Sequence, residues 1–115
     1  MIIRHPTVRC ALFMSLLLVT TVSLAQTSTS EISGTVRDSS GAVIPNAGVM
    51  LTNEATGITY NQSTTNAGFY NFPALPVGSY IITVQASGFK TARLTKNTVV
   101  VNTPLAVDVT LEVGQ

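Results

Sequence analysis

The chain has 115 residues, of which 10% are charged, and its formal net charge is +1. It contains one Cys, one His and no Trp. A chain of this length holds one folded domain, and a single cysteine excludes an internal disulfide. The near-neutral charge gives no electrostatic basis for binding nucleic acid or an anionic membrane surface.

The first 25 residues predict a secretory signal peptide. A short basic start is followed by a nearly continuous apolar run over residues 10–22, and Ser23-Leu24-Ala25 then supplies small residues before a cut. We expect cleavage between Ala25 and Gln26. The run is shorter than the about 20 apolar residues of a membrane-spanning helix, so we expect no membrane insertion by the mature chain.

Cleavage has a chemical consequence, because the only Cys and the only His, Cys10 and His5, lie in the signal peptide. The remaining chain has four basic and five acidic side chains, a net charge of −1. It lacks the Cys and His that serve most often as nucleophile, base or zinc ligand. We therefore expect an exported protein (periplasmic, outer-membrane-associated or extracellular) that is no enzyme and uses no cofactor or metal.

After a short leader at residues 26–30, residues 31–113 predict one all-β domain. Apolar and polar residues alternate with a period of two, and β-branched and aromatic residues are frequent. Gly, Pro, Asn and Asp mark turns between these segments, a pattern that predicts a sandwich of about seven strands. The clearest expected strand segments are residues 32–36, 49–52, 70–72, 80–86, 99–101 and 105–111.

Several residues have expected structural roles. Gly34, inside a strand, predicts a bulge or a close backbone approach. Gly68 and Gly78 each precede an aromatic-bearing strand, which predicts hairpin turns. We expect Tyr70 and Tyr80 to be core aromatics whose hydroxyls reach the rim.

The acidic side chains are scattered along the chain, and Asp38 is the candidate metal ligand among them. Asp38 and Asn66 are candidates for a Ca²⁺ site if their loops meet, but such a site needs about six to eight oxygen ligands. Capping of the turn to Gly41 is the simpler expectation for Asp38. A catalytic Ser/Lys pair is the remaining enzymatic alternative, and we do not expect it.

Three ordered motifs carry a family resemblance. Residues 34–47 read GTVRDSSGAVIPNA and resemble the opening signature of the carboxypeptidase regulatory-like domain. Residues 64–72 (TTNAGFYNF) and 75–80 (LPVGSY) resemble its second half, and residues 87–90 (SGFK) resemble its terminal motif. The resemblance extends over about residues 32–111.

The resemblance implies a prealbumin-like sandwich related to Cna-B and transthyretin-like domains. It implies an accessory module with no peptidase activity, whose partner is another protein or a neighbouring domain. Residues 109–114 (VTLEVG) are similar to the end of the N-terminal extension of TonB-dependent outer-membrane receptors. The chain is therefore expected to be such an extension, a truncated copy of such a receptor, or a free-standing domain. The Lys–Asn crosslink of some Cna-B domains is not expected, because the first strand carries Arg37 and no Lys.

Two binding alternatives stay open. Carbohydrate binding, on a fold that resembles starch-binding modules, would use exposed aromatic side chains, and the candidates are Tyr60, Phe69 and Phe89. The other alternative is strand addition at a sheet edge with few charges. The candidate edge is the strand at residues 94–101, in which Lys96 is the one charge that opposes pairing.

Overall fold

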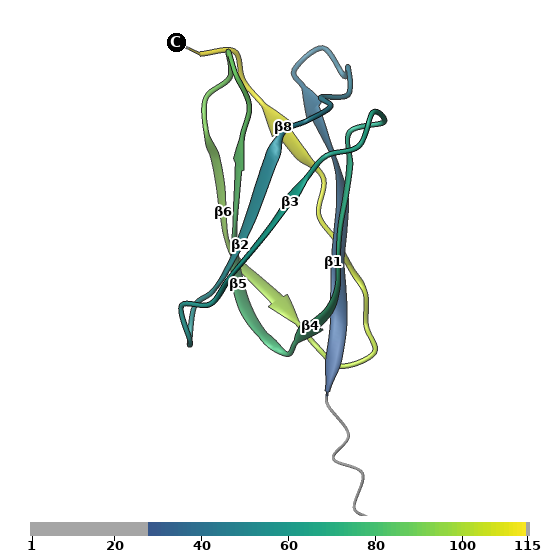
Figure 1. Ribbon diagram of the computed structural model, residues 1–115, viewed down its shortest axis with the longest axis vertical. Coiled ribbons are helices and arrows are strands. Elements are labelled where there is room, and N and C mark those ends of the chain that lie inside the picture. The colour runs from purple at the N-terminus through teal and green to yellow at the C-terminus, as the bar shows by residue number, and fades with distance from the viewer. Residues whose placement is uncertain (1–27, 115) are drawn as a thin grey trace, which may run out of the picture.

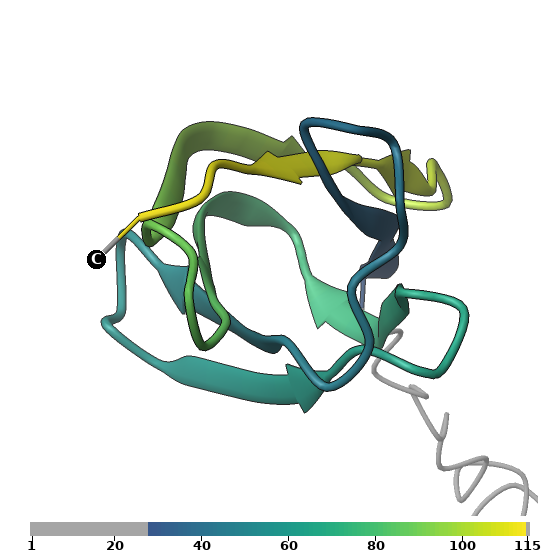
Figure 2. The ribbon, with the colours of Figure 1, turned by 90° about the horizontal axis from the view of Figure 1, so that it is seen from above.

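The computed structural model describes residues 28–114, which form eight strands and no helix. These are β1 (Thr29–Asp38), β2 (Gly48–Asn53), β3 (Thr59–Ser63), β4 (Phe69–Pro76), β5 (Gly78–Gln85), β6 (Ala92–Val99), β7 (Leu105–Ala106) and β8 (Val109–Leu111). Two sheets face each other as a sandwich (Figures 1 and 2). The expected all-β fold is confirmed, whereas the expected signal peptide and its cleavage site lie outside the described residues.

One sheet is antiparallel throughout, with the order β3-β2-β5-β6. In the other sheet β1 is central: β4 pairs with it antiparallel, and β7 and β8 pair with it in parallel on its other side. Buried side chains alternate along β1, β2 and β5, as the sequence predicts. They make one core between the sheets: Ile32, Val36, Ile44, Ala47, Val49, Leu51, Tyr70, Phe72, Leu75, Tyr80, Ile82, Val84, Val99, Val109 and Leu111.

The strand boundaries differ from the expected ones at several places. Of the expected segment at residues 99–101, only Val99 lies in a strand, as the last residue of β6. β1 begins at Thr29, so Thr29 and Ser30 belong to the sheet and not to a leader. The segment expected as one strand at residues 105–111 is interrupted at Val107 and Asp108, which separates β7 from β8. β3 was not among the expected segments, because its sequence TYNQS is polar and four of its five side chains are exposed.

Gly68 and Gly78 do not lie in hairpin turns, so that expectation was wrong. Gly68 belongs to the connection between β3 and β4, and Gly78 is the first residue of β5; at both places the chain passes from one sheet to the other. Gly68 has a φ of 72°, and a side chain there would lie 2.8 Å from the carbonyl oxygen of Val36. Glycine is therefore required at Gly68 by both backbone conformation and space.

Gly34 is where the C-terminal segment comes closest to β1, as the sequence predicts. A Cβ atom on Gly34 would collide with the carbonyl of Val107 and lie 2.9 Å from the Tyr70 hydroxyl. That hydroxyl, opposite Gly34 on β4, donates a hydrogen bond to the Val107 carbonyl oxygen at 2.5 Å. The Thr35 amide donates to Asp108 Oδ1 at 2.9 Å. At the interruption between β7 and β8, two side chains therefore take part in hydrogen bonds to the backbone. The Tyr70 hydroxyl binds the Val107 carbonyl, and the Asp108 carboxylate binds the Thr35 amide.

The two buried tyrosines follow one pattern, in which a backbone carbonyl accepts the phenol proton. The Tyr80 hydroxyl donates to the Pro76 carbonyl oxygen at 2.7 Å, as Tyr70 does to Val107. Both rings are core aromatics, as predicted, with relative exposures of 1% for Tyr70 and 0% for Tyr80. A buried hydroxyl needs such a partner, because an unpaired one costs about 1–3 kcal/mol.

Gly34→Ala should lower the free energy of unfolding by about 3 kcal/mol, because the new methyl group meets rigid backbone on the core side of β1. Gly48→Ala is the matched control: it also lies in a strand, but the nearest atom to its added Cβ is 3.8 Å away. Urea denaturation followed by circular dichroism compares the two variants. Equal stability losses in both variants would contradict the proposed contact.

Candidate functional site

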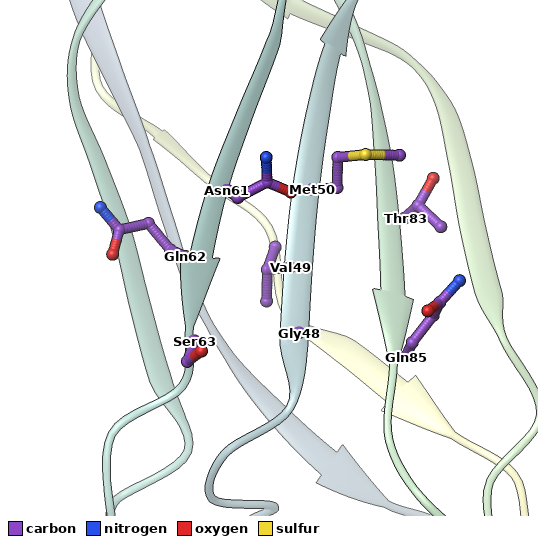
Figure 3. A pocket seen from close by; sticks show the side chains of 8 residues that line it. All are labelled: Gly48, Val49, Met50, Asn61, Gln62, Ser63, Thr83 and Gln85. Carbon is purple, nitrogen blue, oxygen red and sulfur yellow. The ribbon is translucent and has the colours of Figure 1, made fainter.

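A groove of about 570 Å³ lies on the outer face of the sheet, over β3, β2 and β5 (Figure 3). Strand register fixes its side chains in two rows. Met50 lies between Asn61 and Thr83, and Gly48 lies between Ser63 and Gln85. In each row the β2 residue lies between a β3 residue and a β5 residue. The β2 residues Met50 and Gly48 therefore form the floor of the groove.

Gly48 leaves the middle of its row without a side chain. A Cβ on Gly48 would have only one heavy atom within 4 Å, the Gln85 carbonyl oxygen at 3.8 Å. The gap therefore opens toward the solvent and is not filled by a neighbour. Met50, half-buried beside it, supplies an apolar and adaptable surface.

The chemistry of the groove is neutral and polar. Its lining residues are Gly48, Val49, Met50, Asn61, Gln62, Ser63, Thr83 and Gln85, none of which is charged. Amide side chains donate and accept hydrogen bonds at once, and hydroxyls do the same. The arrangement suits a neutral ligand with many hydrogen-bonding groups. This groove could not be predicted from the sequence, because its rows form only when β3, β2 and β5 pair in register.

The three predicted aromatic contacts lie on three different elements. Tyr60 is half-buried on β3, and its ring packs against Tyr80 at a centroid distance of 6.4 Å. Phe69 begins β4 in the other sheet and is 42% exposed. Phe89 lies in the connection between β5 and β6, packs against the core and bridges to Val113. Among residues 28–114, the ring pairs do not join any two of the three.

Asp38 caps the turn after β1, as expected. Its Oδ1 accepts hydrogen bonds from the Ser40 amide at 2.9 Å, the Ser40 hydroxyl at 2.5 Å and the Ala42 amide at 3.1 Å. The hydrogen bond from the Ser40 hydroxyl, followed by those from the backbone, lowers the pKa of Asp38 below its usual range. Asp38 therefore stabilises the turn, and its Oδ1 atom accepts all three of these hydrogen bonds.

Titratable groups are sparse in the described part of the chain. Residues 28–114 contain no cluster of three or more His, Cys, Asp or Glu side chains that could hold a metal ion. Lys90 and Glu112 approach to 3.9 Å, but both side chains are largely exposed.

No helix among residues 28–114 has the length and apolar character that crossing a membrane requires.

Among the described residues, Tyr70 is the one group with a large pKa shift. Burial, and then the nearby Asp108 carboxylate, raise the pKa of Tyr70 to about 12 from an ordinary value of about 10. Both causes disfavour the phenolate, whose negative charge would also face the Val107 carbonyl oxygen. Tyr70 is thus held neutral as a hydrogen-bond donor, a structural role.

The family model of the carboxypeptidase regulatory-like domain matches residues 31–112. No curated protein sequence matches the chain.

Solved structures share the fold at low sequence identity. A candidate carbohydrate-binding protein from Bacteroides uniformis has a TM-score of 0.61 and 14% identity, and the match covers 73% of this chain and 41% of that one. Chlorocatechol 1,2-dioxygenase from Pseudomonas putida has a TM-score of 0.60 and 14% identity, covering 74% and 60%. A streptococcal ancillary pilin has a TM-score of 0.57 and 13% identity, covering 76% and 33%. The chain therefore spans less than two thirds of each of these proteins.

The free energy of unfolding should fall at high pH because of Tyr70. Its folded pKa of about 12 exceeds the unfolded value of about 10, so its contribution is complete below pH 10 and is lost as pH rises toward 12. Tyr70→Phe should lower stability by about 1 kcal/mol at neutral pH through the lost hydrogen bond, and should flatten the alkaline fall. Urea denaturation at increasing pH measures both effects. An alkaline fall of unchanged slope in Tyr70→Phe would contradict the assignment.

Proposed function

The chain belongs to the carboxypeptidase regulatory-like domain family, and from this premise we propose that it is a non-catalytic interaction module of an exported assembly. The observation that carries the proposal is the neutral groove over β3, β2 and β5, which rests on strands fixed in register. Recognition surfaces built on such strands are preorganised, and little conformational entropy is lost on binding.

Export is proposed from the N-terminal sequence. Its basic start, apolar run and small residues before Gln26 have the order of a secretory signal. The site of action would then be the periplasm, the outer membrane or the cell exterior. Within that setting, the chain would serve as the N-terminal extension of a TonB-dependent receptor. The support is the similarity of residues 109–114, in which β8 continues into backbone pairing between Gly114 and Gly88.

Export predicts a defined new N-terminus. When the full sequence is expressed in a Gram-negative bacterium, the product outside the cytoplasm should begin at Gln26, as read by mass spectrometry of the intact protein. Ala25→Phe places a bulky residue where the cleavage site needs a small one, so its exported form should retain the first 25 residues. Ser30→Ala, beyond the site, is the control and should be cleaved normally. A parental product that keeps Met1 would contradict the proposal.

A second candidate function is carbohydrate binding, which two observations favour. Sugars are neutral and rich in hydroxyls, and the groove offers Asn61, Gln85 and Thr83 around the apolar surface of Met50. The Bacteroides uniformis structure with the same fold is described as carbohydrate binding. We place the contact in the groove, because Tyr60, Phe69 and Phe89 lie on separate elements.

Filling the groove should weaken carbohydrate binding. Gly48→Val puts a side chain into the open middle position, and we expect at least a tenfold loss of affinity, or about 1.4 kcal/mol. Titration with neutral oligosaccharides, followed by amide chemical shifts, measures the affinity and locates the contact. Phe69→Ala, on the other sheet, is the control and should bind as the parent does.

The reverse result, with binding lost in Phe69→Ala and kept in Gly48→Val, would move the contact to the exposed aromatics. If no oligosaccharide shifts any amide of the parent, carbohydrate binding is wrong, while the interaction module remains to be tested with protein partners.

A further inference from the structure

The sandwich has strand edges that differ in how they resist pairing with another chain. An edge strand exposes unpaired N–H and C=O groups, and proteins block such edges with prolines, bulges, charges or very short strands. Among residues 28–114, one edge lacks all of these devices.

The edge at β6, expected from the sequence to be the docking strand, is blocked. Two residues of β6 face one of β5 between Leu94 and Asn97, which is a bulge, and Lys96 has a φ of 60° there. The Asn97 side-chain amide donates to the carbonyl oxygens of Leu94 and Tyr80, at 3.0 and 3.1 Å. A bulge with a charged residue at its apex interrupts the regular ladder that an added strand needs.

The edges of the other sheet are blocked as well. On β4, Pro73 lacks an N–H, Ala74 has a φ of 55°, and the register against β1 shifts nearby. On the opposite side, β7 and β8 have only two and three residues and are interrupted at Val107 and Asp108. None of these edges offers a regular run of backbone groups.

β3 has none of these devices. Its five residues pair with β2 in unbroken register, and its sequence TYNQS contains no charge, Pro or Gly. It also forms an outer margin of the domain when the sandwich is viewed from above (Figure 2). β3 is therefore the open edge among those that the structure describes.

The hydrogen bonds of the β2–β3 hairpin show which groups of β3 point outward. The Asn53 amide donates to the Ile58 carbonyl oxygen, and the Thr64 amide donates to the Ala47 carbonyl oxygen, each at 2.9 Å. Because antiparallel partners alternate, the even-numbered residues of β3 bond to β2 and the odd-numbered ones face away. The outward backbone groups are thus those of Thr59, Asn61 and Ser63, for which the described residues provide no partner.

We propose that β3 pairs antiparallel with β3 of a second copy of this chain, about a two-fold axis at Asn61. In this register Asn61 faces its own counterpart, and Thr59 faces Ser63 in both directions. All three residues that point outward then form hydrogen-bonded pairs, and no outward N–H or C=O of β3 is left over. The facing side chains are small and uncharged, so no like charges meet.

The pairing would join the two β3-β2-β5-β6 sheets into one continuous sheet and place the two grooves side by side across β3. It stands independently of what the grooves bind. The contact of five residues per chain is small compared with stable interfaces, so the dimer forms reversibly and at high protein concentration.

Analytical ultracentrifugation of the chain purified after export tests the proposal over a concentration series. We expect a monomer at low concentration and a dimer at high concentration. The Thr59, Asn61 and Ser63 amides should gain hydrogen-exchange protection as the dimer forms. Asn61→Pro removes the two donors of the central pair while sparing the bonds to β2, and should weaken association at least tenfold, or by about 1.4 kcal/mol.

Charge variants test the register. Asn61→Lys alone should weaken association because two lysines face each other, and so should Asn61→Glu. A mixture of the two should restore it, since opposite charges then meet across the axis. Gln85→Lys, on the same outer face but on β5, is the control and should associate as the parent does.

Three results would overturn the proposal. The first is a monomer at every concentration, and the second is a dimer that Asn61→Pro and Asn61→Lys leave unchanged. The third is protection of the Thr59, Asn61 and Ser63 amides only when a different protein is added, which would assign the edge to another partner.

Discussion

The close approach of the Val107 carbonyl to Gly34 is the constraint on which the rest of the sandwich depends. Only a residue without a side chain lets the Tyr70 hydroxyl cross the core side of β1 and reach that carbonyl. The contact joins Gly34 from the first sequence motif, Tyr70 from the second and the C-terminal segment, which lie far apart in the chain. The contact lies on β1, which is placed between β4 and the two short parallel strands.

The two sheets differ in role: the β1 sheet contains this stabilising contact, and the other sheet contains the groove and the open edge. In the sheet built on β1, strands pair with both edges of β1. The C-terminal segment of this sheet then forms backbone hydrogen bonds with Lys90 and Gly88 in the loop after β5. In the other sheet, the outer face over β2 has an open row at Gly48, and the edge strand β3 pairs with β2 in unbroken register. The proposed binding groove and the proposed self-pairing edge therefore lie on the same sheet, away from the contact that stabilises the fold.

The sequence predicts what is local and misses what depends on pairing. Alternation along β1, β2 and β5 predicts these strands, because one face of each is buried. β3 lacks that signal, since an edge strand with exposed side chains needs no alternation. Turn chemistry at Gly68 predicts a reversal but does not say whether the next strand joins the same sheet. The groove depends on the alignment of Gly48 with Ser63 and Gln85, and a single sequence does not contain that alignment.

Hydrogen exchange at the Thr35 and Val107 amides tests the central constraint most directly. Thr35 donates to Asp108 and Val107 donates to the Ser33 carbonyl oxygen, so both amides lie at the contact itself. If the fold depends on this contact, both amides exchange only through global unfolding, with an opening free energy equal to that from urea denaturation. Exchange of either amide by a local opening of much lower free energy would contradict the account.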